Sequence, residues 1–122
     1  MIHTESEVWK AAMDLAVIVY GVTKSLPRDE RFGLAAQMKR AAASVPSNVA
    51  EGAGRETVRE KRRFLIDARG SITELETQLE LCFRLGFLSS GDLERTRPVV
   101  LRARQLLAGT IRSLTARMPH NA

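Results

Sequence analysis

Apolar residues recur every three or four positions through nearly the whole chain, and this spacing limits the fold more than any other feature. An α-helix has about 3.6 residues per turn, so the spacing places apolar side chains on one helix face. The pattern runs through residues 5–26, 29–53, 57–85 and 92–118, and no strand pattern competes with it. The sequence therefore predicts an all-α fold, in which residues 1–122 form one domain, an antiparallel up-down four-helix bundle with short turns.

The first segment carries more apolar surface than one seam of a bundle needs. Two neighbouring stripes run along it, one made of Val8, Ala12, Leu15, Val19, Val22 and Leu26 and the other of Trp9, Met13, Ala16 and Tyr20. A helix with two stripes packs against more than one partner helix. The fourth segment adds Val99, Leu101 and Leu106 outside its main stripe. Apolar surface that is left after one core is filled indicates self-association.

The second segment carries a polar stripe beside its apolar face. The stripe consists of Gln37, Arg40, Ser44, Asn48, Glu51 and Arg55, and the apolar face holds Met38, Ala41, Ala42, Val45, Val49 and Ala53. Polar groups close to a core need hydrogen-bonding or charged partners. Within this segment Pro46 removes one backbone donor and is expected to bend the helix, with Ser44 and Asn48 able to satisfy the groups that it frees.

Two interpretations of this polar stripe stay open. In the structural one, Arg40, Glu51 and Arg55 form an ion-pair network that fixes register or a subunit interface. Asn48 and Gln37 then bond to neighbouring backbone. In the functional one, the same groups line the mouth or lumen of an oligomer and hold a ligand. The structural interpretation is favoured, because buried polar groups more often specify assembly than chemistry.

Glycine and proline mark helix ends and close contacts. Gly52 and Gly54 are expected to stop the second helix. Gly70 and Ser71 lie in the middle of the third helix, where small residues let another backbone approach closely. Pro98 is expected to kink the first turns of the fourth helix.

Positive charge is concentrated at the end of the chain. Residues 1–94 hold 13 basic and 14 acidic side chains, whereas residues 95–122 hold six arginines and no acid, which leaves the whole net charge of +5 on the last segment. Unpaired guanidinium groups suit phosphate contacts. The six candidates for nucleic-acid binding there are Arg95, Arg97, Arg102, Arg104, Arg112 and Arg117.

A second basic cluster opens the third helix. It consists of Arg59, Lys61, Arg62 and Arg63, but Glu56, Glu60 and Asp67 lie close by, so a solvated and partly self-paired face is a serious alternative. Binding through such groups is expected to be electrostatic, with little sequence preference. Stacking on single strands is not expected, because the aromatic residues mostly fall on apolar faces; these are Trp9, Tyr20, Phe32, Phe64, Phe83 and Phe87.

Catalysis, metal binding and cofactor binding find no support in the sequence. His3 and His120 stand near the termini, away from residues that would complete a site. Cys82 falls on an apolar arc with no histidine placed to activate it, so a buried structural cysteine is expected. The segment 52–55 lacks the lysine and the preceding strand of a phosphate-binding loop. With no secretion signal and no apolar run that could span a membrane, we expect a cytoplasmic protein of bacterial type.

Two ordered blocks of sequence are similar to a known family. The first is residues 37–52, and the second comprises residues 63–65, 68–71 and 74–76. Shorter pieces fit at residues 8–11, 26–27, 30–34 and 85–88. In these blocks the chain resembles the 23S rRNA intervening-sequence proteins, a four-helix-bundle family that includes the accessory variability protein of diversity-generating retroelements. The resemblance implies a homopentamer arranged as a ring, a number that the periodicity alone does not provide.

Two functions follow as hypotheses from the charge and the resemblance. The first is a non-enzymatic, oligomeric protein that binds nucleic acid, most plausibly structured RNA such as rRNA, through phosphate contacts. The second is a protein-interaction scaffold or accessory subunit, for example for a reverse transcriptase, as the resemblance implies. An enzyme is disfavoured, and no cofactor or membrane partner is expected.

Overall fold

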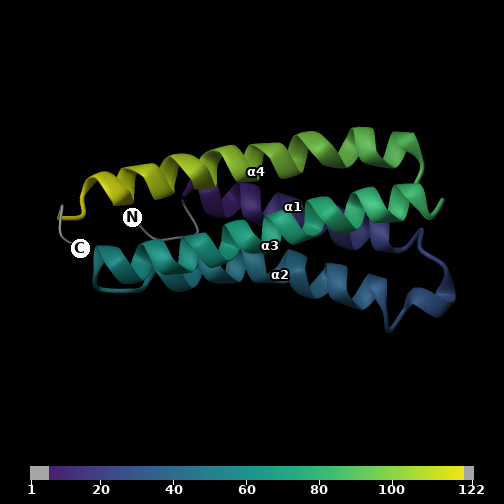
Figure 1. Ribbon diagram of the computed structural model, residues 1–122, viewed down its shortest axis with the longest axis horizontal. Helices are drawn as coiled ribbons and strands as arrows, with labels where there is room; N and C mark the ends of the chain where they lie inside the picture. The colour runs from purple at the N-terminus through teal and green to yellow at the C-terminus, as the bar shows by residue number, and fades with distance from the viewer. Residues whose placement is uncertain (1–5, 120–122) are drawn as a thin grey trace.

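The computed structural model describes residues 6–119 and contains, in that range, four α-helices, one short 3-10 helix and no strand (Figure 1). The helices are α1 (Glu7–Thr23), η2 (Arg28–Glu30), α2 (Leu34–Ala53), α3 (Val58–Arg84) and α4 (Ser90–Ala116). The all-α prediction with four long helices is confirmed. The first long helix is shorter than expected, and the second begins at Leu34 because η2 occupies the turn before it.

Every long helix begins with a side chain that accepts a hydrogen bond from the first turn. The hydroxyl groups of Ser6, Thr57 and Ser89 accept from the third residue of α1, α3 and α4, each at 3.1 Å. The Glu30 carboxylate does this for α2 by accepting from the Leu34 amide at 3.1 Å. These first-turn amides have no partner inside the helix, so the caps explain where each helix starts.

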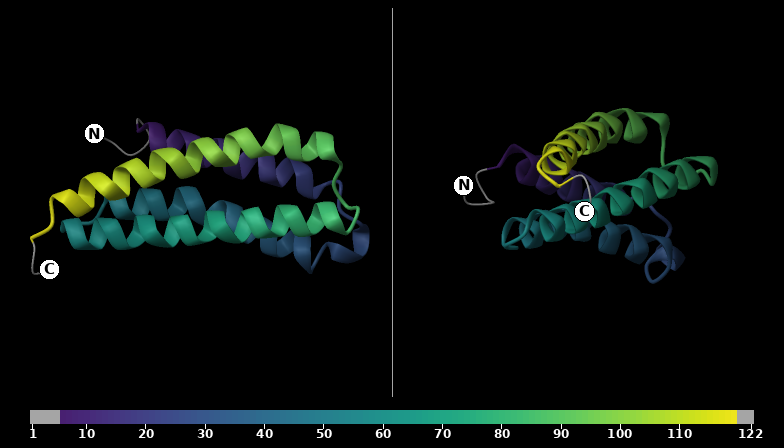
Figure 2. Two further views of the ribbon diagram at one scale, coloured as in Figure 1. Left: turned by 45° about the horizontal axis from the view of Figure 1, so that its top comes forward. Right: turned by 60° about the vertical axis from the view of Figure 1, so that its left-hand side comes forward.

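The four helices stand at the corners of a bundle. α1 contacts α2 and α4, and α3 also contacts α2 and α4, whereas the diagonal pairs α1–α3 and α2–α4 are not in contact. Figures 1 and 2 show the start of α1 and the end of α4 at the same end of the bundle, with the α2–α3 turn close to them. The side chains at that end therefore come from segments far apart in the sequence.

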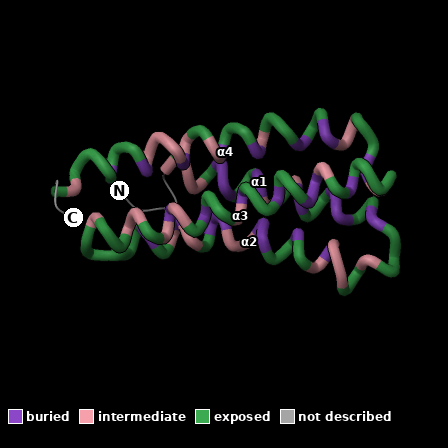
Figure 3. The backbone as a smooth tube through the Cα atoms, in the orientation of Figure 1, coloured by how far each residue is buried: buried purple, intermediate pink, exposed green. Residues whose placement is uncertain are grey.

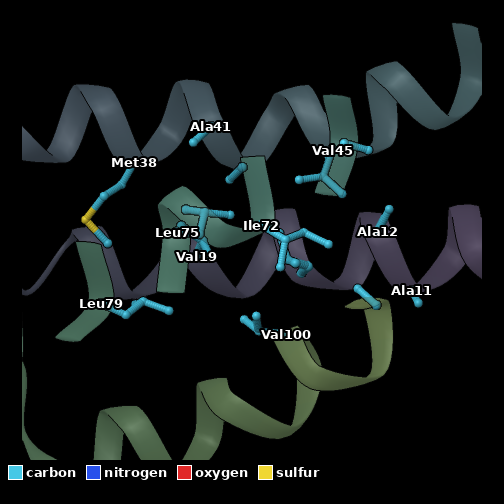
Figure 4. Close-up of a cluster of buried hydrophobic side chains, with 14 of the residues drawn as sticks. Ala11, Ala12, Val19, Met38, Ala41, Val45, Ile72, Leu75, Leu79 and Val100 are labelled. Atoms are coloured by element: carbon cyan, nitrogen blue, oxygen red, sulfur yellow. The ribbon is translucent and has the colours of Figure 1, made fainter. Parts of the chain in front are cut away.

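One continuous apolar core runs between the helices. Its largest fully buried side chains are Leu15, Val19, Met38, Val45, Ile72, Leu75, Thr96, Cys82 and Leu107. Figure 4 shows Met38, Ala41 and Val45 on one helix facing the side chains of the others. Buried positions recur along the inner side of each helix and exposed ones along the outside (Figure 3). Removal of this apolar surface from water is the main force that holds the bundle together.

α2 and α3 approach each other through small residues. A Cβ atom built on Gly52 lies 3.1 Å from the Lys61 carbonyl oxygen and 3.2 Å from the Phe64 Cβ, so only hydrogen fits there without movement. Further along, the Ser44 and Ser71 hydroxyl groups are hydrogen-bonded to each other across the same interface. Gly70 does not take part, since it is exposed and a Cβ there meets nothing within 4 Å. The close approach expected of both Gly70 and Ser71 thus holds for Ser71 alone.

Glycine does not stop α2 in the expected way. Gly52 is inside the helix, and Gly54 caps it with a right-handed φ of −87°. Within the described residues only Gly86 has a positive φ, of 81°. α2 nevertheless ends at Ala53, the predicted residue, with Gly54 as its C-cap.

Pro46 and Pro98 lie inside continuous helices. α2 runs through Pro46 and α4 through Pro98. Without an amide hydrogen on Pro46, the Ala42 carbonyl loses its usual donor. Ser44 donates to the Ala41 carbonyl at 2.7 Å and Asn48 donates to the Ser44 carbonyl at 2.9 Å, so neither side chain serves Ala42 as we had expected. The bends expected at the two prolines stay predictions.

Alanine substitution at the two glycines should change stability in opposite directions. Gly70→Ala fills open space in a helix interior and should raise the free energy of unfolding by about 1 kcal/mol. Gly52→Ala gains the same helix propensity but presses on the α3 backbone, and overpacking costs about 1–3 kcal/mol, so it should not stabilise. Urea unfolding of both variants at one protein concentration measures the difference. Equal stabilisation by both would refute the close α2–α3 contact.

The start of α4 should make stability depend on pH. Asp92 and Ser89 form a capping box, and hydrogen bonds from the Ser89 backbone and hydroxyl, together with Arg95, lower the pKa of the Asp92 carboxyl below its ordinary 3.8. A lowered folded-state pKa adds stability above pH 3.8 that is lost as the pH falls through the folded pKa. The difference in Tm between the wild type and Asp92→Ala should therefore be largest near neutral pH and shrink in acid. Glu94→Ala, on the exposed side of the same turn, is the control and should show no such trend.

Candidate nucleic-acid interface

Four of the six candidate arginines of α4 form ion pairs. Two pair with α3, Arg97 with Glu80 at 3.5 Å and Arg104 with Glu76. Arg102 pairs with Glu7 of α1 at 3.5 Å, and Arg95 pairs with Asp92 in its own helix. The expectation that these arginines lack acidic partners is wrong for all four. Asp92 lies three residues before Arg95, and neighbouring helices supply the other three with carboxylates that are distant in sequence.

Arg104 is the most strongly held of these arginines. Its Nε donates to Glu76 Oε2 at 3.2 Å, and its Nη2 donates to Glu76 and to the Thr73 hydroxyl, the latter at 2.8 Å. Only 29% of its side chain is exposed. A guanidinium with two carboxylate bonds is geometrically fixed. Arg104 thus joins α4 to α3 and presents little free charge to a ligand.

The remaining basic candidates gather where α3 begins and α4 ends. Arg62 Nε donates to the Thr115 hydroxyl at 2.7 Å, which ties these two segments together. Arg59 lies one turn from Arg62, and Arg112 lies one turn from Thr115. We call the whole set the cationic end; it comprises Arg59, Lys61, Arg62, Arg63, Arg112 and Arg117. Within residues 6–119 none of the six forms an ion pair.

The local charge of this end is positive. Residues 56–67 and 112–117 together hold six basic side chains and three acidic ones, the latter being Glu56, Glu60 and Asp67. Those three acids also form no ion pair in the described structure, so the self-paired face that served as the alternative is not observed. Lys61 donates to the Ala53 carbonyl at 3.1 Å and so complements the negative end of α2. The other five cations have no such fixed anionic partner.

Phe64 carries two guanidinium groups beside this end. The Arg55 guanidinium carbon lies 4.6 Å from the ring centroid and that of Arg63 lies 4.8 Å from it. Such cation–π contacts hold the arginines in place without neutralising them. Arg63 therefore keeps its charge available, whereas Arg55 also pairs with Glu51 at 3.0 Å.

The polar stripe of α2 is not one network within a single chain. Only its Glu51–Arg55 pair is an ion pair, and Asn48 bonds to its own helix. Gln37 and Arg40 are exposed and make no side-chain bond within residues 6–119. Ser44 bonds to Ser71 of α3. The stripe thus offers Gln37, Arg40 and the Glu51–Arg55 pair to solvent, where a second chain or a ligand can reach them.

Cys82 does not belong to a catalytic or metal site within residues 6–119. Cys82 is buried as expected, with its thiol 3.6 Å from Met38 Sδ, and burial raises its pKa to about 11. A thiol with this pKa is protonated at neutral pH and does not act as a nucleophile. His3 and His120 lie outside the described residues. Among residues 6–119 no group of three or more metal-ligating side chains occurs, and no helix there is long and apolar enough to cross a membrane.

The sequence analysis missed one group of basic residues. Lys24, Arg28, Arg31 and Lys39 surround the turn between α1 and α2 and line a pocket there. Their spacing on both sides of Pro27 is the signal that could have revealed them, since a turn brings its two flanks together. They were overlooked because the excess charge lies elsewhere in the sequence.

Comparison with known proteins identifies the family. The family model described as 23S rRNA-intervening sequence protein matches residues 4–109. This range covers α1, α2, α3 and most of α4, and it leaves Arg112 and Arg117 beyond the match. No curated protein matches the chain. Because the match spans most of its length, the chain belongs to the 23S rRNA-intervening sequence protein family.

Proposed function

We propose that this protein is a non-enzymatic nucleic-acid-binding protein whose cationic end contacts the phosphates of structured RNA, such as rRNA. The observation that carries the proposal is the division of its arginines into two groups. Arg95, Arg97, Arg102 and Arg104 are matched by carboxylates, whereas the cationic end forms no ion pair within residues 6–119. Charge that is not neutralised within the protein remains available to a polyanion.

The chemistry of this end suits phosphate more than bases. Guanidinium forks match phosphate oxygens, and binding releases condensed counterions, so affinity falls with salt. The positive end of the α3 dipole adds to the field of Arg59, Arg62 and Arg63 in its first two turns. Such contacts position a protein on RNA without reading its sequence. The name of the family makes 23S rRNA the first structured RNA to test.

We also propose that the protein works as a homo-oligomer, a pentameric ring of antiparallel bundles, with the α1–α2 face between copies. Met13, Val17 and Tyr20 line a groove of about 720 Å³ between α1 and α2, and Val17 is 69% exposed. These residues include part of the second apolar stripe of the first segment. In a ring each copy contacts the next through two different faces, so burial of these exposed apolar groups against another face of the neighbouring copy supplies the driving force. A ring would repeat the cationic end once in every copy.

Neutralising the cationic end should weaken RNA binding. The variant Arg59→Gln/Arg63→Gln/Arg112→Gln/Arg117→Gln removes four unpaired charges and should reduce the affinity for a labelled rRNA hairpin by at least about tenfold. The slope of log K against log salt should fall by about one for each arginine that contacts a phosphate. Fluorescence anisotropy across a salt series measures both quantities.

The matched control removes the same formal charge from the paired arginines. It is Arg95→Gln/Arg97→Gln/Arg102→Gln/Arg104→Gln, and it should keep most of the affinity and the salt slope. Circular dichroism and sedimentation must show that both variants fold and assemble like the wild type. Equal losses in both variants would mean that net charge alone matters and would contradict a localised interface.

A charged residue in the α1–α2 groove should disrupt assembly. Val17→Glu places a carboxylate in the proposed contact between copies, where desolvation without a partner is costly. Sedimentation velocity should show a smaller particle than for the wild type, with helix content retained. Gln105→Glu, at an exposed position of α4, is the control and should leave the mass unchanged. An unchanged mass for Val17→Glu would remove this groove from the interface.

A scaffold or accessory subunit, for example for a reverse transcriptase, is the second candidate function. The observation that favours it is the same exposed apolar groove, because a partner protein can occupy it in place of another copy. Wild-type protein that stays a monomer and shows no RNA binding at low salt would favour this candidate. RNA binding that depends on the cationic end would favour the first.

A further inference from the structure

The turn between α1 and α2 forms a pocket of about 520 Å³ with a cationic rim. Lys24, Arg28, Arg31 and Lys39 contribute its charged side chains, and all four are exposed. Leu26 and Ala35, both buried, supply its apolar floor. Positive groups around an apolar base form a site that can hold an anion with an attached ring. We call this site the turn pocket.

The charges of the turn pocket are not neutralised by the protein. None of its four cations forms an ion pair within residues 6–119. Of the two acids on the turn, Glu30 is engaged in capping the Leu34 amide at 3.1 Å, and Asp29 is exposed outside the pocket lining. The rim thus differs from Arg97, Arg102 and Arg104 of α4, whose carboxylate partners lie on adjacent helices.

The exposed aromatic ring of Phe32 lies beside this pocket. Phe32 is 87% exposed, the largest value among the exposed large apolar side chains of the described residues. The guanidinium carbon of Arg31, which lines the pocket, lies 5.1 Å from the centroid of the ring. The prediction that Phe32 lies on an apolar helix face is wrong, because this residue falls in the turn between η2 and α2 and belongs to neither helix.

Lys39 joins the pocket to a second ring. Its ammonium group lies 5.7 Å from the centroid of Tyr20, which is itself exposed. The pocket therefore has an aromatic ring at each of two of its cations. This arrangement of cations beside exposed rings is the one by which proteins hold single-stranded nucleic acid, with phosphates on the cations and bases on the rings.

We propose that the turn pocket binds the phosphate of an unpaired nucleotide while Phe32 stacks against its base. Arg28 and Arg31 provide guanidinium forks for phosphate oxygens, and Lys24 and Lys39 provide ammonium groups. Stacking tolerates any base, because every base has a π-face. The proposal goes beyond the phosphate contacts of the cationic end, since it uses other residues, lies at another turn and requires an unstacked base.

Two variants of the pocket separate stacking from charge. Phe32→Ala should weaken binding of a fluorescein-labelled oligoadenylate by about tenfold and leave the salt slope unchanged. Lys24→Gln/Arg28→Gln should lower the salt slope by up to about 0.7, since these cations hold one phosphate and each phosphate contact on a single strand contributes about 0.7. Fluorescence anisotropy over a salt series, with the full chain, gives both values. A structural role for these exposed side chains would not change the salt slope.

Matched controls remove the same groups elsewhere. Leu101→Ala deletes an exposed apolar side chain, and Lys10→Gln/Arg69→Gln removes two charges far from the pocket; neither should change oligoadenylate affinity by more than about twofold. Calorimetry with adenosine monophosphate forms a second arm. Binding of the mononucleotide that requires Phe32 identifies a free nucleotide as ligand, whereas binding of the oligomer alone identifies an unpaired strand. No Phe32-dependent binding in either arm overturns the proposal.

The test also separates the turn pocket from the cationic end. Phe32→Ala should bind a duplex RNA hairpin stem like the wild type, because paired bases are stacked inside the helix and cannot reach the ring. The cationic-end variant should retain the contribution of Phe32 to oligoadenylate binding. Loss of hairpin binding with oligoadenylate binding intact therefore points to the cationic end, and the reverse result points to the turn pocket.

Discussion

The close contact between α2 and α3 determines where the functional groups of this molecule lie. With no side chain on Gly52, the α3 backbone at Lys61 passes directly over α2, and the Ser44–Ser71 hydrogen bond keeps the two helices in register further along. The start of α3 is fixed by this contact. Its position then allows Arg62 to reach Thr115 and brings the end of α4 alongside. The uncharged residues Gly52, Ser44 and Ser71 thus determine where the basic side chains at the start of α3 and the end of α4 lie.

Ion pairs on the surface of this bundle matter more for its electric field than for its stability. Exposed pairs such as Arg97–Glu80 contribute between zero and about 1 kcal/mol, and salt screens them further. Each pair nevertheless cancels a charge that would otherwise attract a polyanion. Acids of α3 and α1 pair with Arg97, Arg102 and Arg104 of α4, whereas the cationic end and the rim of the turn pocket form no ion pair within residues 6–119. Arginines that are spread widely in the sequence therefore leave unpaired charge at only a few places on the folded protein.

The sequence was sufficient to predict the helices, but it was not sufficient to predict which side chains of different helices contact each other. Apolar periodicity and the capping residues Ser6, Thr57 and Ser89 act locally, so the helices could be placed within a few residues. The pairing of Arg104 with Glu76 depends on which helices become neighbours and at what register, and no local pattern encodes that. Phe32 shows the same limit, since its exposure follows from η2 rather than from its own type. The sequence predicted that the residues of the polar stripe lie on one helix face and that Glu51 and Arg55 take part in ion pairing. It did not predict that Ser44 bonds to Ser71 or that Asn48 bonds to the carbonyl of Ser44.

The groove and the turn pocket are parts of one continuous surface, and this links the two proposals made for it. Lys24 and Lys39 line both of them, and Tyr20 of the groove lies under the Lys39 ammonium group. A second copy that covers the groove must therefore stop at the rim of the turn pocket or contribute to it. In either arrangement the low dielectric of an adjacent interface strengthens the attraction between the rim and a phosphate. Assembly and nucleotide binding at this turn should accordingly favour each other, because a bound phosphate pairs with the lysines that a neighbouring copy removes from water.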